Sequence, residues 1–442
     1  MSILFVANRA EIASRVIATA SKRGFTTAIA YPEVDAELPY VRAADIRIQL
    51  ESPRSFIDAE QMVAAATQVG ASFVHPGYGF LSENTAFARA VEAAGMTFVG
   101  PSPEVIEQMG DKANARAIAI AAGVPVTRGS DEPITEFREA QEVANQVGFP
   151  LMIKAVAGGG GIGMAVVRES QELQAAFDHV SGRAATVFGD PRLIVEQYIA
   201  RSRHIEVQVM GLPNGEVVAF AERDCSVQRR HQKVIEESPS PILTSSMREA
   251  IVASARELAE SVGYTNAGTV EFIFDQDKNE FYFLEMNTRL QVEHPVTEAL
   301  HSVELVAWQL SVASGHSQYP EGFSSTPNGH AIELRLYAAD SVRFLPRPGK
   351  IARWEMPVGD RVRVDAGYEE GNTVTPFFDP LMAKITTHGR DRQEALQAAV
   401  SAIESTVVEG PGCNRDYLQK VLKSDAFAEG TYSTGLVIEP AA

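Results

Sequence analysis

The chain has 442 residues, of which 45% are hydrophobic and 22% charged, and this length predicts roughly two to four domains. Its formal net charge of −18 disfavours a nucleic-acid partner bound through phosphates, and no apolar run approaches the length of a membrane span. The first residues lack the basic start of a signal peptide, and Cys225 and Cys413 have no metal-binding spacing. We therefore expect a reduced, cytoplasmic protein without a nucleic-acid or membrane partner.

The N-terminal third alternates short apolar runs with segments of helical spacing. We expect strands at residues 3–7, 26–31, 73–75 and 97–99, and helices at 11–22, 54–69 and 83–94. This alternation predicts a parallel, doubly wound sheet, whose ligands bind beyond the carboxyl ends of the strands. Residues 8–9 and 75–79 follow such strands and are candidates for one wall of a site, although 75–79 also fits a simple Pro/Gly turn.

The stretch PLMIKAVAGGGGIGMAVV, residues 150–167, places Lys154 on an apolar strand before a run of glycines. Glycines let backbone N–H groups approach a phosphate closely, and a lysine adds a positive charge. The spacing matches neither the Walker loop nor a dinucleotide fingerprint. We interpret it as a strand–loop–strand lid over a nucleotide, because apolar strands on both sides argue against a flexible linker.

A basic cluster follows the expected strand at residues 204–210. It consists of Gln228, Arg229, Arg230, His231 and Lys233 in an otherwise acidic chain. Such a run is usually a solvated loop, but the nearby acidic segments favour an anion site.

A β-hairpin is predicted by residues 269–274 and 281–286, which flank a polar loop at 277–279. Side-chain alternation puts Glu285 and Asn287 on one face, and a loop centred on Lys278 would place Glu271 opposite Glu285. Facing carboxylates with a neighbouring amide suit Mg²⁺. A charged, solvated edge hairpin is the alternative.

The C-terminal part continues with an expected helix at 298–314 and a strand at 329–337. That strand would carry Glu333, Arg335 and Tyr337 on one face. A β-rich stretch to 387 and helices at 392–407 and 414–422 complete the prediction.

Together these motifs closely resemble biotin carboxylases of the ATP-grasp family, over nearly the whole chain. The matching stretches are ANRAEIASRV (7–16), HPGYGFLSEN (75–84), MGDK (109–112), KAVAGGGGIGM (154–164), RHIEVQV (203–209), ERDCSVQRRHQKVIEE (222–237), EMNTRLQVEHPVTE (285–298) and GHAIELR (329–335). The resemblance implies an α/β (α+β) fold in three parts: a doubly wound domain at 1–112, a mobile ATP-grasp lid domain at 113–199, and a β-rich C-terminal part at 200–442.

The resemblance also implies a role for each matching residue. The ATP contacts would be Lys112, Lys154, the loop glycines Gly158, Gly159, Gly160, Gly161 and Gly163, the hinge residues Glu196 and Ile199, and His204, Gln228 and His231. Glu271, Glu285 and Asn287 would hold Mg²⁺ or Mn²⁺. The bicarbonate pocket would comprise Lys233, Arg289, Gln291, Val292 and Glu293. Arg335 and Tyr78 would face biotin, with Glu83 on the same far wall.

The implied activity is that of an ATP-dependent C–N ligase, which carboxylates biotin on a carrier protein through carboxyphosphate. Glu293 would be the general base, Lys233 and Arg289 would hold bicarbonate, and Arg335 would stabilise the biotin enolate. The implied partners are a biotin carboxyl carrier protein, a carboxyltransferase and a second copy of the chain, in fatty acid or acyl-CoA metabolism. The sequence has no Met-Lys-Met attachment motif, so we expect the carrier on another polypeptide.

Several residues depart from the family pattern: Ile162 where arginine is usual, Ala10 for glycine, Gln197 for lysine, and also Ala339 and Asp360. The motifs fit both the urea-carboxylase and the acyl-CoA carboxylase branches, so the acceptor stays open. Two alternatives are another ATP-grasp carboxylate–amine ligase and a non-catalytic nucleotide-binding paralogue. The first would not need the Arg289, Gln291 and Glu293 set, and the second should have lost some of the catalytic residues.

Overall fold

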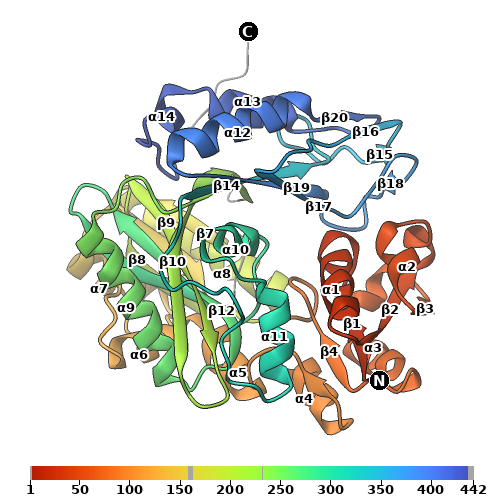
Figure 1. Cartoon of the computed structure of the whole chain (residues 1–442). Helices are drawn as coiled ribbons and strands as arrows, with labels where there is room; N and C mark the ends of the chain where they lie inside the picture. The colour runs from red at the N-terminus through yellow and green to blue at the C-terminus, as the bar shows by residue number, and fades with distance from the viewer. Residues whose placement is uncertain (1, 158–162, 231, 437–442) are drawn as a thin grey trace.

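The N-terminal part of the computed structural model, which describes residues 2–157, 163–230 and 232–436, is a five-stranded parallel sheet of order β3-β2-β1-β4-β5 (Figure 1). The strands are β1 (Ile3–Val6), β2 (Thr26–Pro32), β3 (Ile46–Leu50), β4 (Phe73–His75) and β5 (Thr97–Phe98). The helices are α1 (Ala10–Lys22), α2 (Pro39–Ala43), α3 (Ala59–Gln68), α4 (Thr85–Ala93) and α5 (Pro103–Gly110), with short turns η1 (Glu33–Asp35) and η2 (Pro53–Ile57). The predicted doubly wound sheet is confirmed, and its strand order reverses at β1, where such sheets bind ligands.

Two details of this part differ from the sequence prediction. The expected helix at 54–69 is divided into η2 and α3, because the Asp58 carboxylate caps α3 by accepting the Gln61 N–H at 3.0 Å. Strand β3 was not predicted. It lies at the sheet edge, where its first four side chains alternate between half-buried and exposed and only Leu50 is buried, so that no apolar run forms.

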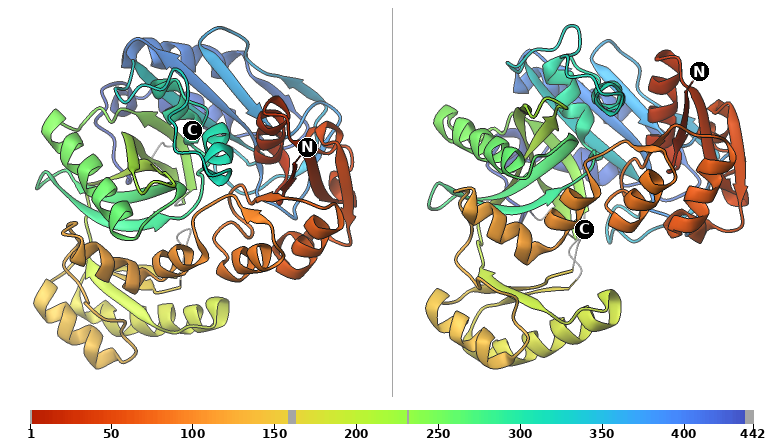
Figure 2. Two further views of the ribbon diagram at one scale, coloured as in Figure 1. Left: turned by 60° about the horizontal axis from the view of Figure 1, so that its bottom comes forward. Right: turned by 90° about the horizontal axis from the view of Figure 1, so that it is seen from below.

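A separate lobe follows, which we call the lid lobe (β6–β8 with α7 and α8). It contains α7 (Phe137–Val147), β6 (Leu151–Ala155), β7 (Met164–Val167), η3 (Ser170–Glu172), α8 (Leu173–Phe188) and β8 (Leu193–Gln197). The strands form an antiparallel sheet of order β7-β6-β8, and α7 and α8 pack on it around Ile153 and Phe177. Figure 2 shows this orange-to-yellow lobe standing apart from the rest of the chain. The predicted strands around the glycine loop are present, and Gly158 to Ile162 lie outside the described residues.

An eight-stranded antiparallel sheet of order β13-β12-β9-β10-β11-β14-β19-β17 forms the centre of the molecule. Its strands are β9 (Ser202–Gly211), β10 (Val217–Arg229), β11 (Gln232–Ser238), β12 (Asn266–Asp275), β13 (Glu280–Asn287), β14 (His330–Tyr337), β17 (Val362–Ala366) and β19 (Leu381–Gly389). The sheet joins the predicted hairpin at one edge to the C-terminal elements at the other. Residues that lie far apart in the sequence are therefore placed on one continuous surface.

Helices and two small ribbons complete this part. They are α6 (Lys112–Ala121), α9 (Ser245–Ser261), α10 (His294–His301), α11 (Leu305–Ala313), α12 (Arg392–Ser405), α13 (Arg415–Leu422), α14 (Asp425–Ala428), and the strand pairs β15 (Gly349–Lys350) with β18 (Thr373–Val374) and β16 (Arg353–Glu355) with β20 (Val407–Glu409). The single helix expected at 298–314 is wrong. Ser302 has a positive φ of 50°, which ends α10 before α11 begins.

The N-terminal sheet is joined to the C-terminal part by a buried contact around Arg9. Its guanidinium donates to Asp35 at 2.6 and 2.7 Å and to the Tyr368 hydroxyl at 3.1 Å, and lies 3.9 Å from the ring centre of Phe378. Next to it, a Cβ on Gly367 would lie 2.6 Å from the backbone nitrogen of Glu11. The start of α1 is therefore fixed against the C-terminal elements.

Replacing Glu237 on β11 would measure how much a buried ion-pair cluster contributes to the stability of the central sheet. Burial raises its pKa, but His330 and Arg392, at 2.6 and 2.7 Å, hold the pKa at about 2. A lowered pKa in the folded state stabilises the fold above the ordinary carboxyl pKa of 4.5, and this stability is lost as the pH falls toward 2. We expect Glu237→Gln to reduce the free energy of unfolding at neutral pH by about 3–5 kcal/mol. Thermal denaturation should show the deficit shrinking on acidification, and a deficit that does not depend on pH would contradict this explanation.

Candidate active site

One cleft of about 940 Å³ lies where the N-terminal sheet, the lid lobe and the central sheet meet. It brings together nearly all the predicted site residues that the structure describes, namely Tyr78, Lys112, Lys154, Glu196, Ile199, His204, Gln228, Lys233, Glu271, Glu285, Asn287, Arg289, Gln291, Val292, Glu293 and Arg335. Gly163 is described but does not line the cleft, and Gly158, Gly159, Gly160, Gly161 and His231 lie outside the described residues. Glu83, expected on the far wall, does not line the cleft, and its carboxylate accepts from Arg289 at 2.8 Å.

The β12–β13 hairpin places Glu271 opposite Glu285, as predicted. The expected loop of residues 277–279 is wrong, because pairing continues only to Asp275 and Glu280 and the loop is 276–279. The Asp275 carboxylate accepts the Asp277 N–H at 3.0 Å, and Asn279 takes a positive φ of 55°. An irregularity at Leu284 then shifts the register by one residue and restores the predicted pair.

The buried carboxylate of Glu271 is surrounded by donors. Lys233 Nζ lies at 3.0 Å and His204 Nε2 at 2.8 Å, and the side-chain amides of Gln291 and Asn287 donate at 2.7 and 2.9 Å. Burial alone would raise the pKa of Glu271, but the charges of Lys233 and His204 hold it well below its ordinary value. Glu271 is therefore ionised at neutral pH.

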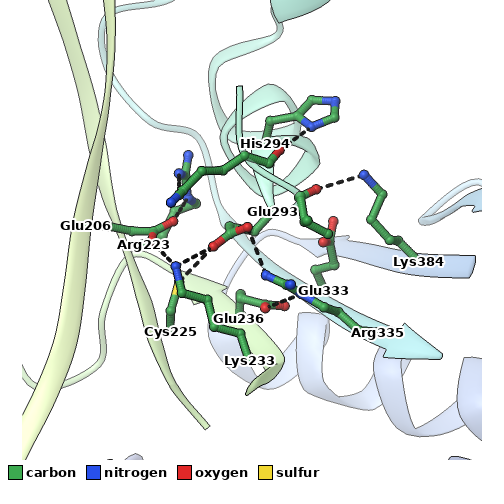
Figure 3. A network of polar contacts seen from close by, with 12 residues as sticks. Glu206, Arg223, Cys225, Lys233, Glu236, Glu293, His294, Glu333, Arg335 and Lys384 are labelled. Atoms are coloured by element: carbon green, nitrogen blue, oxygen red, sulfur yellow. Dashed lines mark hydrogen bonds and ion pairs between the residues drawn. The ribbon is translucent and has the colours of Figure 1, made fainter. Parts of the chain in front are cut away.

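A second cluster lies deeper in the cleft, around Glu293 (Figure 3). The Lys233 ammonium contacts Glu206 at 2.6 Å and Glu293 at 2.8 Å, in addition to Glu271. The other oxygen of Glu293 accepts from Arg335 Nη2 at 2.8 Å. Burial raises the pKa of Glu293, but Lys233 and Arg335 outweigh it and hold this pKa well below the ordinary range. The arrangement is an ionised carboxylate between two cations at the wall of a cleft.

Comparison with known proteins identifies the family. Residues 1–106 match the biotin carboxylase N-terminal domain, 111–319 the carbamoyl-phosphate synthase L chain ATP-binding domain, and 333–439 the biotin carboxylase C-terminal domain. The chain is 45% identical to a biotin carboxylase of Halalkalibacterium halodurans over 438 residues, covering 98% of this chain and 96% of that protein. The chain belongs to the biotin carboxylase family.

Two further comparisons agree with the family assignment. Biotin carboxylase 2 of Bacillus subtilis is 44% identical, and the match covers 98% of both chains. Among solved structures, the biotin carboxylase domain dimer of 2-oxoglutarate carboxylase from Hydrogenobacter thermophilus, in complex with MgADP, ADP and bicarbonate, matches with a TM-score of 0.95. Its sequence is 39% identical, and the match covers 98% of this chain and 96% of that one. The predicted ATP-grasp fold of a biotin carboxylase is thereby confirmed.

The facing carboxylates of this family member fit a hard divalent cation. Glu271, Glu285 and Asn287 offer only oxygen ligands, as Mg²⁺ and Mn²⁺ require. A lysine already neutralises each carboxylate, since Lys233 contacts Glu271 at 3.0 Å and Lys112 contacts Glu285 at 3.0 Å. Each of the two carboxylates thus lies beside a positive charge, and a bound cation would add positive charge between them.

The lid lobe forms another wall of the cleft. Lys154 on β6 forms an ion pair with Glu196 on β8, and the Thr127 hydroxyl donates to Glu196 at 2.8 Å. Burial raises the pKa of Glu196, but Lys154 lowers it below its ordinary value. The lysine is thereby held facing the cleft.

Sequence analysis missed three buried residues that support these cleft residues. Glu206 accepts from Lys233 and from Arg223 Nε, each at 2.6 Å, and Arg223 also donates to Gln291 at 3.0 Å. Glu236 pairs with Arg335 Nε at 2.6 Å. The alternation His204, Glu206, Gln208 on a predicted strand could have indicated Glu206, because polar residues then recur on one face.

Replacing Glu285 tests the metal assignment. Glu285→Gln keeps the shape of the side chain but removes one of the two facing carboxylates, so we expect weaker Mn²⁺ binding in titrations and a loss of Mg²⁺-dependent ATP hydrolysis by orders of magnitude. Glu280→Gln is the matched control, because Glu280 is exposed on the same strand outside the cleft. Equal Mn²⁺ affinity in both variants would mean that the hairpin is only a charged surface and does not bind the metal.

Proposed function

We propose that this chain carboxylates biotin in a reaction that consumes ATP and bicarbonate, as a biotin carboxylase. The observation that carries the proposal is the position of Glu293, which is ionised between Lys233 and Arg335 in the cleft that also holds Lys112 and Lys154. A phosphate-binding end and a base with two cations then share one enclosed space, as a reaction through a labile mixed anhydride requires.

In the proposed phosphoryl transfer, a bicarbonate oxygen attacks the γ-phosphorus of ATP, the bond to ADP breaks, and carboxyphosphate forms. Lys112 and Lys154 would bind the phosphates, and the loop of Gly158, Gly159, Gly160, Gly161 and Gly163 would cover them. Glu271, Glu285 and Asn287 would hold the metal, which when bound neutralises charge on the phosphates. Glu196, Ile199, His204 and Gln228, all at the cleft wall, would contact the adenosine part.

Glu293 would accept the bicarbonate proton during this step. Lys233 and Arg289 would bind the anion, and Gln291 and Val292 would complete its pocket. Arg289 is preorganised, since it donates to Glu83 at 2.8 Å and to Asn287 at 3.1 Å. The backbone carbonyl of Val292 is likewise held, by Lys384 Nζ at 2.7 Å. The pocket therefore needs little rearrangement on binding.

Biotin is the substrate of the second step. Carboxyphosphate would break down to CO₂ and phosphate, and the phosphate would take the proton of the ureido nitrogen. Arg335 would stabilise the negative charge on the ureido oxygen as this nitrogen attacks CO₂. Tyr78 reaches the cleft from the N-terminal sheet and would form the opposite wall. The three-part division at 1–112, 113–199 and 200–442 assigns each wall to one unit and remains a proposal.

The proposed partners are a biotin carboxyl carrier protein and a carboxyltransferase. The proposed location is the cytoplasm. Among the described residues, no helix combines the length and apolar character needed to cross a membrane. We also propose a homodimer formed through the C-terminal part.

The two half-reactions should separate in variants. Arg335→Ala should leave bicarbonate-dependent ATP hydrolysis largely intact, because Lys233 still holds Glu293, but should reduce biotin carboxylation by about 10²–10³. Glu293→Gln should suppress both activities, because the base is lost. Phosphate release with and without free biotin measures both. A parallel loss in Arg335→Ala, accompanied by a lower melting temperature, would mean that Arg335 only holds the sheet.

The proposed dimer can be tested by light scattering. At micromolar concentration we expect a mass near twice the 47.8 kDa of one chain. Many dimeric members carry a charged pair where this chain has the exposed residues Ala18 and Lys22 of α1, so the dimer should weaken measurably on dilution. A single-chain mass at all concentrations would contradict the proposal.

A further inference from the structure

The guanidinium of Arg335 is held by two carboxylates that differ in their surroundings. Glu293 accepts from Nη2 at 2.8 Å and lines the cleft, whereas Glu236 contacts Nε at 2.6 Å and does not line it. The remaining nitrogen of the guanidinium, Nη1, lies 3.5 Å from the Tyr337 hydroxyl. Glu236 and Glu293 thus contact two different nitrogens of one guanidinium (Figure 3).

Glu236 itself lies opposite a third glutamate. Strands β11 and β14 pair Glu236 directly with Glu333, and both side chains are fully buried. One oxygen of Glu333 accepts from the Thr386 hydroxyl at 2.9 Å, and the other has no hydrogen-bond partner among the described residues. Two buried carboxylates facing each other cannot both be ionised at low energetic cost.

The charged groups around the pair do not remove this conflict. Those facing it are Arg335 on β14, Lys384 on β19, Lys233 on β11, Glu206 on β9 and Glu293 at the start of α10. Within the described part of the chain, only Arg335 forms an ion pair with Glu236, and none is formed with Glu333. Burial raises the pKa of Glu236 to about 7 and that of Glu333 to about 8. The pair therefore holds a proton at neutral pH, and the ion pair with Arg335 favours the negative charge on Glu236 and the proton on Glu333.

We propose that Glu236 is a positioning residue for Arg335, and that Glu333 holds the proton that lets Glu236 stay ionised. The assignment rests on the proposed function. The role of Glu236 follows from the proposed reaction, because Glu293 loses its negative charge when it accepts a proton. Arg335 then loses one of its two anionic contacts, just before biotin needs it. Glu236 lies outside the cleft and keeps the guanidinium oriented through that change.

The test compares three variants, in each of which one buried glutamate is replaced by glutamine. Glu236→Gln should reduce biotin carboxylation by about 10–100-fold, the usual effect of losing an outer partner of a functional group. It should raise the KM for biotin and leave bicarbonate-dependent ATP hydrolysis near wild type. Glu333→Gln mimics the protonated acid and should keep both activities. Glu237→Gln, the neighbouring buried residue on β11, is the control, which should lower the melting temperature without changing the ratio of the two activities.

A second readout needs no turnover. A carboxyl group whose pKa is raised in the folded state adds stability at low pH, and this stability is lost as the pH rises from the ordinary pKa of 4.5 to the folded-state values of about 7 and about 8. The melting temperature of the wild type should therefore fall over that range. Glu333→Gln should flatten this slope, because glutamine does not titrate, whereas Glu237→Gln should keep it.

Three results would overturn the proposal: normal biotin carboxylation by Glu236→Gln, a loss in Glu333→Gln as large as in Glu236→Gln, or an unchanged pH slope in Glu333→Gln. Failure of the proposed function looks different. In that case the wild type itself would not carboxylate biotin, while the slope would still report the shared proton.

Discussion

The contact on which the site depends is that of the Lys233 ammonium with Glu206, Glu271 and Glu293. Three buried carboxylates repel one another strongly at low dielectric, and removing their common cation would leave several kcal/mol uncompensated. Because Lys233 touches all three, it fixes Glu271 relative to Glu293. Two arginines lie at the edges of this group. Arg223 closes it from behind Glu206, and Arg335 closes it beyond Glu293.

The register of the central sheet explains how these residues meet. Glu285 pairs with Glu271, Glu271 with Glu206, and Glu206 with Arg223, so one row of charged residues crosses four strands. Each strand contributes one member, and a slip of one residue would turn that member to the other face. The irregularity at Leu284 shows this constraint in a single strand, because it restores the row after a loop that is one residue longer than predicted.

Patterns within one or two neighbouring strands were readable from the sequence. The Glu271–Glu285 pair, the parallel N-terminal sheet and the strands around the glycine loop needed only local periodicity. Glu206 and Glu236 were missed, since their importance comes from strands that are distant in sequence: β9 beside β12, and β11 beside β14. The helix expected at 298–314 is divided because Ser302 takes a positive φ, and a serine in the sequence does not indicate this backbone conformation. Most individual site residues came from family resemblance, and the structure then placed those it describes around one cleft, except Gly163 and Glu83.

The buried contact around Arg9 has a consequence for how the enzyme exchanges its small molecules. It fastens the first sheet to the C-terminal elements through Asp35 and Tyr368, and the close approach of Gly367 leaves no slack between them. Two walls of the cleft therefore behave as a single rigid half. We therefore expect passage in and out to depend on the third wall, the lid lobe, so that its position sets both the admission of nucleotide and the residence time of ADP.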